Sequence, residues 1–475
     1  MFQGSKRRLG MTVKGNAAVE RITRLPATKF IAIGCLTLLL LVPTMLVWGL
    51  VEERADRARE VGNDIANAWG QQQSVVGPVL AVPFVTRIPL ADTGKNDEPR
   101  FRVSRSTVFL FPESLDITAD ARVEERHRSI FKLPVFRGAI DLKGRFAPAT
   151  IDPDSLSAEG AVTLLPMEAF VVIGIGDVRA IKNDVAMRIN GGAPRPFAPG
   201  PGGNERAGRG SRGSAIHLPV SESEWRGGFS FATTLALNGS RAISFAPAGQ
   251  STTLAMTSDW PHPGFAGRYL PDTRDIRDDG FSARWSVPYL ARGVASSIVA
   301  EALPIDASIE VNFVDPLSIY QTVARALKYA VAFFGLTFMA VFVLELRSGW
   351  RLHWIQYLLV GFALVVFFVL LLALTEQVGF AWAYLIAFLA TTTLVGAYVG
   401  SATGSRASGA ITAAALTVVY GVLYLILNDQ DYALLAGAIV AFVALAATML
   451  ATRNVDWSGG APAPVDAPLE GVAAE

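Results

Sequence analysis

The sequence has little charge, four histidines and one cysteine among its 475 residues. Charged residues make up 17% of the chain, against roughly a quarter in an average soluble protein. The single cysteine, Cys35, excludes an intramolecular disulfide framework. A zinc site needs three or four converging ligands, and no HExxH or CxxC spacing supplies them. We therefore expect no metal, no cofactor and no nucleic-acid partner.

The apolar residues are concentrated in two regions of the chain. No charge interrupts residues 30–51, and residues 329–452 form a second apolar region, whereas residues 52–320 carry charges of both signs throughout. The few charged residues of the second region are Glu345, Arg347, Arg351, Glu376, Arg406, Asp429 and Asp431. This distribution predicts a membrane protein with a large water-exposed insertion.

A membrane-spanning helix needs about 20 consecutive apolar residues. Segments of this length predict six transmembrane helices, joined in the second region by short linkers that favour a compact bundle. They cover residues 30–50, 327–346, 354–374, 380–400, 408–427 and 432–451. The first segment is too long for a cleavable signal. We therefore expect it to be retained, with a kink at Pro43.

The basic residues predict the orientation of these helices, because Lys and Arg are retained in the cytoplasm. A basic segment, residues 1–29, precedes the first helix, and alternation places Arg347, Arg351, Arg406 and Arg453 on the same side. Arg325 and Lys328 alone oppose the rule. Both termini, including the Ala/Pro-rich tail 452–475, should thus be cytoplasmic, and residues 51–322 periplasmic.

The sequence predicts mostly β-strands in the periplasmic domain. Before them, residues 52–72 should continue the first transmembrane helix out of the membrane. "GAIDLKGRF" (138–146) and "GFSARWSV" (280–287) alternate apolar and polar residues, as half-buried strands do. In "FSFATTLALNGSRAISF" (229–245), Asn238-Gly239 predicts a tight hairpin turn between two strands. The Gly/Pro/Arg-rich stretch 193–213 predicts a flexible loop and a candidate boundary between two subdomains.

One proline-locked stretch could be a functional site. In "TSDWPHPGF" (257–265), Pro261 and Pro263 hold Trp260 and His262 extended, which favours a rigid corner over chemistry by His262. "GIGD" (174–177) indicates a strand end and turn, since it lacks the third glycine of a dinucleotide fingerprint. The remaining candidates are His127, His217, His353 and the carboxylates Asp272, Asp275, Asp278 and Asp279, which Arg274 and Arg277 neutralise.

An ionisable group in mid-membrane often marks a transport path. Glu345 is expected at the inner end of its helix, reaching toward the interface, while Glu376, Asp429 and Asp431 lie in outer turns. None is central, so an ion-coupled transporter is disfavoured. No catalytic, cofactor-binding or metal residue is therefore assigned.

Several motifs resemble the CreD family of bacterial inner-membrane proteins named for cell envelope integrity. They include "VPTMLVWGLVEERADRAREV", "VVGPVLAVPF", "FLFPESL", "VEERHRSIFKLPVFRGAI", "TSDWPHPGFAGRYLP", "LHWIQYLLVGFALVVFFVLLLALTE" and "ATRNVDW". The resemblance implies six helices, a periplasmic domain, and a role in envelope stress and colicin tolerance, with no established catalytic residue.

The expected function is therefore envelope support without covalent chemistry, and the chain is not expected to be an enzyme. Its partners would be the lipid bilayer and unidentified envelope proteins or lipids, with the oligomeric state open. Two alternatives remain: a carrier of lipid or envelope precursors that uses an apolar groove, and a membrane-embedded hydrolase.

Overall fold

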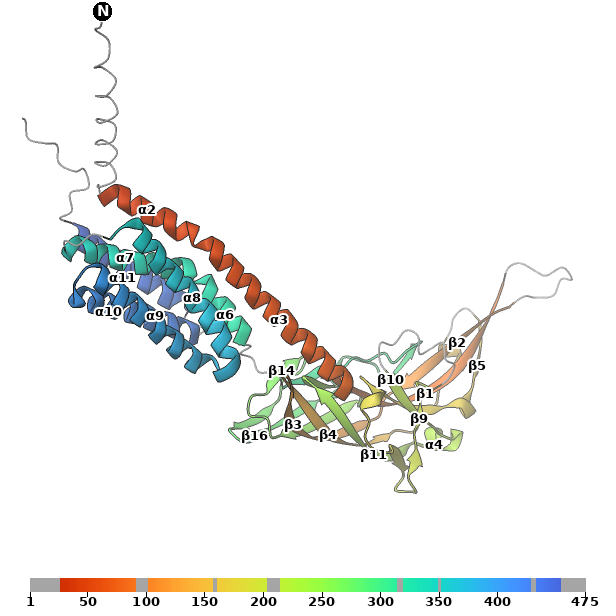
Figure 1. Cartoon of the computed structure of the whole chain (residues 1–475). Helices are drawn as coiled ribbons and strands as arrows, with labels where there is room; N and C mark the ends of the chain where they lie inside the picture. The colour runs from red at the N-terminus through yellow and green to blue at the C-terminus, as the bar shows by residue number, and fades with distance from the viewer. Residues whose placement is uncertain are drawn as a thin grey trace, which may run out of the picture. The chain divides into compact units, whose positions relative to one another are not determined.

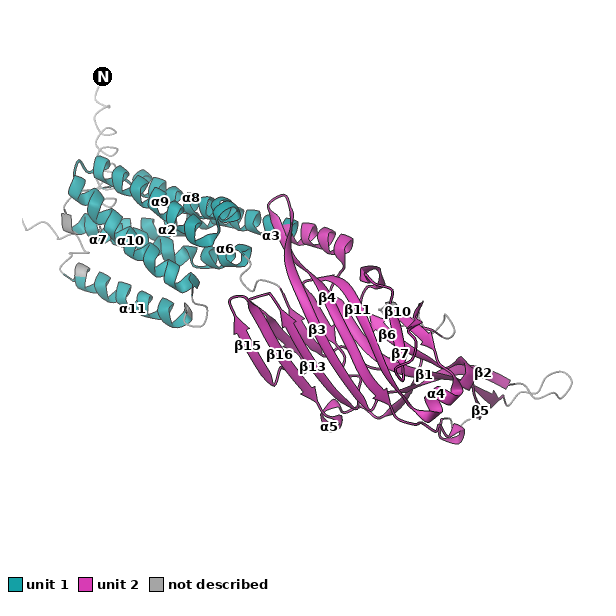
Figure 2. Ribbon diagram, turned by 90° about the horizontal axis from the view of Figure 1, so that it is seen from below, with its two compact units in different colours: residues 1–57, 317–475 teal, residues 58–316 magenta. Residues whose placement is uncertain are grey.

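The structure, a computed structural model, describes residues 26–90, 101–156, 160–202, 214–313, 319–348, 352–428 and 433–453. They form two compact units (Figure 2), one comprising residues 1–57 and 317–475 and the other residues 58–316. The first is helical and the second is rich in β-strands (Figure 1). Apolar helices together with a large β-rich region confirm the expected fold class in outline.

The helical unit contains the apolar segments. Its helices are α2 (Pro26–Leu39), α3 (Leu41–Trp69, which continues into the second unit), α6 (Ile319–Lys328), α7 (Ala330–Ser348), α8 (Trp354–Val378), α9 (Phe380–Ala402), α10 (Arg406–Asn428) and α11 (Ala433–Thr452). In the described part of the chain, four spans are long and apolar enough to cross a membrane, the first being α2 with α3. The bent pair α6 and α7 would make five, and the apolar part of α11 is shorter, so six spans remain a prediction.

Two helices are interrupted. The break between α2 and α3 falls at Leu40, close to the Leu39 carbonyl that Pro43, without an N–H, cannot bond. Most of the expected helix 327–346 lies in α7, and its first two residues end α6, which is bent by 50° from α7. Helix α6 buries Tyr320, Val323 and Leu327 on one face, but its polar residues had left it outside the apolar pattern.

The second unit contains two β-sheets in the described residues. The first has ten strands: β14 (Gly264–Gly267), β18 (Ile309–Asn312), β12 (Ala242–Phe245), β1 (Gln73–Pro89), β6 (Phe170–Ile175), β10 (Ser214–Pro219) and β9 (Ala198–Pro199) in that order, with β2 (Phe101–Leu110), β5 (Ala161–Leu164) and β17 (Ser297–Ala300) beside them. The second has eight, in the order β15 (Thr273–Arg277), β16 (Gly280–Val287), β13 (Ser251–Ser258), β3 (Ser114–Arg128), β4 (Phe131–Phe146), β11 (Phe229–Ser240), β7 (Ala186–Ile189) and β8 (Arg195–Pro196).

Both sheets contribute to one hydrophobic core. Val171 of the first sheet and Ile140, Leu235 and Trp285 of the second belong to a single cluster of buried side chains. Short helices α4 (Glu222–Gly227) and α5 (Tyr289–Arg292) lie outside the sheets. Residues 58–316 group as one compact unit, in which both sheets share the core. Residues 203–213 of the expected loop lie outside the described part, and β8 and β9 lie in its beginning.

The alternating patterns correctly identified strands. Phe281, Ala283, Trp285 and Val287 of β16 are all buried, and the polar residues between them are exposed. β4 likewise covers the segment predicted for it, residues 138–146. A period of two is sufficient here because each strand presents one face to the shared core.

The predicted hairpin turn at Asn238-Gly239 is wrong. β11 continues through both residues, and the chain turns at Arg241, whose φ is +64°. β12 then joins the other sheet, parallel to β1 and antiparallel to β18. Gly239 is required for packing instead, because a Cβ there would lie 2.2 Å from a Phe136 ring carbon.

Candidate functional site: the anchorage of helix α3 in the β unit

The last turns of α3 pack against the β3–β4 hairpin. Val61, Ile65 and Trp69 recur at helical spacing in "VGNDIANAW", which gives this part of the helix an apolar stripe. Ile65, Ala66 and Trp69 form a small hydrophobic cluster with Leu133 and Val135 of β4. The polar residues on either side of the stripe remain available for bonds to the strands.

Trp69 is held by basic residues of the hairpin. The guanidinium carbon of Arg126 lies 4.3 Å from the centre of the indole ring and that of Arg137 lies 5.4 Å away, both within the range of cation–π attraction. The indole Nε1 donates a hydrogen bond to the Phe136 carbonyl at 3.4 Å. One turn earlier, Asp64 pairs with Arg128 at 2.8 Å. These exposed contacts orient the helix on the sheet.

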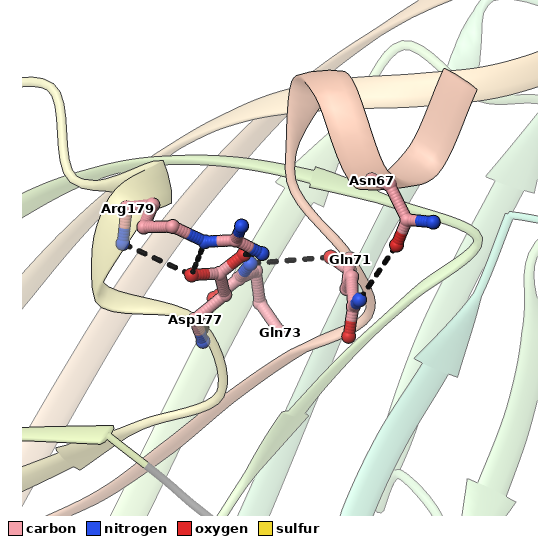
Figure 3. A network of polar contacts seen from close by, with 5 residues as sticks. All are labelled: Asn67, Gln71, Gln73, Asp177 and Arg179. Atoms are coloured by element: carbon pink, nitrogen blue, oxygen red, sulfur yellow. Dashed lines mark hydrogen bonds and ion pairs between the residues drawn. The ribbon is translucent and has the colours of Figure 1, made fainter. Parts of the chain in front are cut away.

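The turn from α3 into β1 is fixed by backbone and side-chain hydrogen bonds (Figure 3). Gly70 has φ +142°, and a Cβ there would lie 2.8 Å from the Asn238 carbonyl oxygen. Gln71 donates to the Asn67 side chain at 2.7 Å, and its carbonyl accepts from the Gln73 amide at 3.1 Å. The same carbonyl accepts the backbone N–H of Ser240 at 3.2 Å. The end of the helix is therefore tied to β11.

Gln73 connects this turn to the end of β6. Its side chain is fully buried, and its amide oxygen accepts the backbone N–H of Asp177 at 3.3 Å. Asp177 caps the short helix η3 (Val178–Ala180) and accepts two side-chain hydrogen bonds from Arg179, at 3.0 and 2.8 Å (Figure 3). Those bonds hold the pKa of Asp177 below its ordinary value, against the opposing effect of burial. The "GIGD" segment is thus a strand end and turn, as predicted.

Arg241 brings the two chain connections of the β unit together. Its guanidinium donates to the Asn63 side chain of α3 at 2.8 Å. Its backbone carbonyl accepts the N–H of Phe313, the residue after β18, at 2.7 Å. The chain therefore enters and leaves the β unit beside the same residue.

The acidic side chains described in the anchorage, Asp64 and Asp177, are each paired with an arginine, so neither is available as a general base. Within the described residues, no group of three or more His, Cys, Asp or Glu could hold a metal ion. Sequence analysis missed this site because its partners are distant in sequence, as with Asp177 and Gln73, which are 104 residues apart.

The other candidate residues make no contact that would bring them together as one site among the described residues. His262 is exposed, and its carbonyl accepts the Trp260 indole N–H at 3.0 Å. Trp260 and Phe265 pack against the core, the latter edge-on to Phe281 and Trp285, as a corner requires. His127 is exposed, His217 lies in β10, and His353 caps α8. Among the candidate carboxylates, Asp272 accepts a hydrogen bond from the Ser286 N–H, and Asp275 pairs with Arg277.

Glu345 does not reach out to the interface as expected. It is 6% exposed and pairs with Lys29 of α2. It also accepts hydrogen bonds from the Tyr357 hydroxyl at 2.7 Å and the Leu352 N–H at 3.1 Å. A buried carboxylate must be paired, and helix α2 supplies the cation. Glu376 accepts the Tyr320 hydroxyl at 3.0 Å, whereas Asp429 and Asp431 lie outside the described residues.

Comparison with known proteins identifies the family. A family model described as "Inner membrane protein CreD" matches residues 26–458. The chain belongs to the CreD family. The protein of Escherichia coli K12 with that name is 36% identical over 428 residues, which cover 88% of this chain and 91% of the relative. The chain is accordingly a bacterial, multi-pass inner-membrane protein, and the family is not one of known enzymes.

Similarity to solved structures is slight. An M1 zinc metallopeptidase from Deinococcus radiodurans aligns over 43% of this chain and 42% of its own, with 12% identity and a TM-score of 0.19. A similarity at this level says nothing of the function of the chain.

Proposed function

We propose that the chain supports cell envelope integrity through non-covalent interactions of a periplasmic β unit that is coupled to the membrane by helix α3. The observation that carries the proposal is the convergence at Arg241, whose guanidinium bonds Asn63 of α3 and whose backbone carbonyl bonds Phe313, the residue after β18. A displacement of the β unit by a partner would act on both chain connections together. Envelope proteins or lipids are the proposed partners, and family membership supports the cellular role.

Loosening the anchorage should impair function more than folding. Asn63→Ala with Asp64→Ala removes the bonds to Arg241 and Arg128 while leaving the apolar cluster intact. Exposed pairs of this kind contribute about 0.2–1 kcal/mol each, so the variant should accumulate normally. In a deletion strain challenged with detergent, we expect it to restore survival only partly.

The control is Glu222→Ala, which breaks the exposed pair with Arg226 on α4, elsewhere in the same unit. It should restore survival fully. If the α3 variant also restores full survival at normal abundance, coupling through these bonds is not needed for function.

The proposed topology has six membrane spans, cytoplasmic termini and residues 51–322 in the periplasm. It is supported by the loop charges and by the apolar helices of the helical unit, α2 with the start of α3 and α7 to α11. Alkaline phosphatase, active only after export, should be active when fused after Ser318 or Gln430. Fusions after Trp350, Ser405 or Trp457 should be inactive. An active fusion at Ser405 would refute the six-span arrangement.

A further inference from the structure

A cavity of about 420 Å³ lies between α9 and α10 in the helical unit. One stripe of α9, with Tyr384, Leu385 and Phe388, lines one side, and Tyr420 and Tyr424 of α10 line the other. Sites for small ligands commonly measure about 300–1,000 Å³. The cavity is therefore large enough to hold a ligand rather than being a packing defect.

The shape of the cavity follows from the residues along the two helices. Toward the α9–α10 loop the helices touch backbone to backbone, because a Cβ on Gly409 would lie 2.5 Å from the Gly396 carbonyl oxygen and 3.0 Å from the Gly400 Cα. Glycines at this spacing allow close approach of membrane helices. Toward the other end the facing residues are aromatic, and Tyr384 and Tyr424 have ring centres 5.1 Å apart. These bulky rings keep the two helices apart at that end, and the cavity lies beside them.

Contacts with neighbouring helices fix Tyr384 and Tyr420, which line the inner side of the cavity. The Tyr384 hydroxyl donates to the Tyr420 carbonyl at 2.6 Å, which ties α9 to α10. Phe333 of α7 and Phe367 of α8 each lie 4.7 Å, centre to centre, from the Tyr420 ring. Edge-to-face contacts of this kind fix ring orientations. The cavity is thus pre-formed and does not need to be opened by a ligand.

The mouth of the cavity opens on the outer surface of these helices. Trp382 and Leu385 are 65% and 41% exposed, and a Cβ on Gly421 would meet nothing within 4 Å. No charged residue lines the cavity, and the Thr417 hydroxyl already bonds the Ala413 carbonyl. In a multi-pass membrane protein, such an apolar surface is in contact with hydrocarbon.

We propose that this cavity binds one acyl chain of a bilayer phospholipid. No charged side chain in the lining could pair with the phosphate of a head group, whereas a hydrocarbon chain matches the mainly aromatic and aliphatic lining. A helix from a second copy fits less well, because the lined stripe from residue 381 to residue 388 is about 10 Å long and a membrane-spanning helix about 30 Å. The proposal does not depend on the function proposed above.

The test fills the cavity in the full-length protein. Gly421→Leu places a side chain in open space, so the helix should fold as before. The purified variant and the wild type are reconstituted in phosphatidylethanolamine vesicles containing a trace of the same lipid with a diazirine on one acyl chain. After irradiation, labelled peptides are quantified by mass spectrometry.

For the wild type, we expect labelling concentrated in residues 381–388 and 417–424. Gly421→Leu should reduce it about tenfold there, the effect of displacing two methylene groups from an apolar site. Gly335→Leu on α7, also built into open space, is the matched control and should leave the labelling unchanged. Unaltered gel-filtration elution of both variants will show that they remain folded.

Three outcomes would overturn the proposal. The first is equal labelling of Gly421→Leu and the wild type at these segments. The second is labelling spread evenly over all outward-facing helices, which is ordinary contact with the bilayer. The third is a cross-link between α9 or α10 of two copies, obtained with a separate bifunctional reagent in the same vesicles, which would mean that a helix occupies the site.

Discussion

Glu345→Ala is expected to remove most of the protein from the membrane. The carboxylate joins Lys29 of α2, the Leu352 N–H before α8 and the Tyr357 hydroxyl within α8. Its loss leaves the N–H and the hydroxyl without their acceptor, and Lys29 without a counter-charge and with only the Leu352 carbonyl, at 2.8 Å, as acceptor. Removing one partner of a buried ion pair costs about 3–5 kcal/mol, which is much of the stability of a typical domain. Because the Lys29 side chain is 26% exposed, we expect the lower end of that range. Immunoblots of membrane fractions would measure the loss.

Replacing both partners should cost far less than replacing one. Lys29→Met with Glu345→Met leaves no unpaired charge, and exchanges of this kind are often neutral. Glu376→Gln is the matched control, since an amide oxygen can still accept the Tyr320 hydroxyl. If the single and double variants accumulate equally, the pair is not what holds α2 against α7 and α8.

Gly239→Asn should unfold or loosen the β unit. A side chain there would meet the Phe136 ring at 2.2 Å and the Gln73 Cγ at 2.8 Å, and both residues are fully buried. Overpacking of this kind costs about 1–3 kcal/mol or more. Protease resistance of the β unit in membrane vesicles would show the loss.

Asparagine is chosen because it separates the two roles of Gly239. A tight hairpin turn accepts asparagine readily, whereas a packing contact with Phe136 does not. Gly227→Asn on α4, where a Cβ meets nothing within 4 Å, controls for the substitution itself. Wild-type protease resistance of Gly239→Asn would restore the turn interpretation.

The sequence predicted those helices and strands whose residues follow one simple pattern, either alternation of apolar and polar residues or a continuous apolar run. β16 alternates because one face meets the core, and α8 and α9 are apolar throughout because they lie in the bundle. Helix α6 was missed because it does not satisfy the rule of a continuous apolar run. Its polar residues break the apolar run, although its buried stripe of Tyr320, Val323 and Leu327 has helical spacing.

Contacts between distant residues could not be predicted in this way. The partner of Glu345 is Lys29, 316 residues away, and no spacing rule relates them. Asn238-Gly239 has the sequence of a turn, but Phe136 and Gln73 occupy the space beside it. The anchorage of α3 escaped notice for the same reason, since Asn63, Arg241 and Phe313 meet only in the folded unit.

The parallel pairing of β1 with β12 has a consequence for folding. Gln73 pairs with Ile243, and Ile243 in turn pairs with Val311, so the middle of the ten-stranded sheet joins the first, middle and last parts of the unit. During synthesis, the edge of β1 that pairs with β12 stays uncovered until β12 is made, and the other edge of β12 stays uncovered until β18 is made. High contact order of this kind slows folding and prolongs exposure of strand edges. The unit should therefore depend on protection by a chaperone while it is being made, more than the helical unit does.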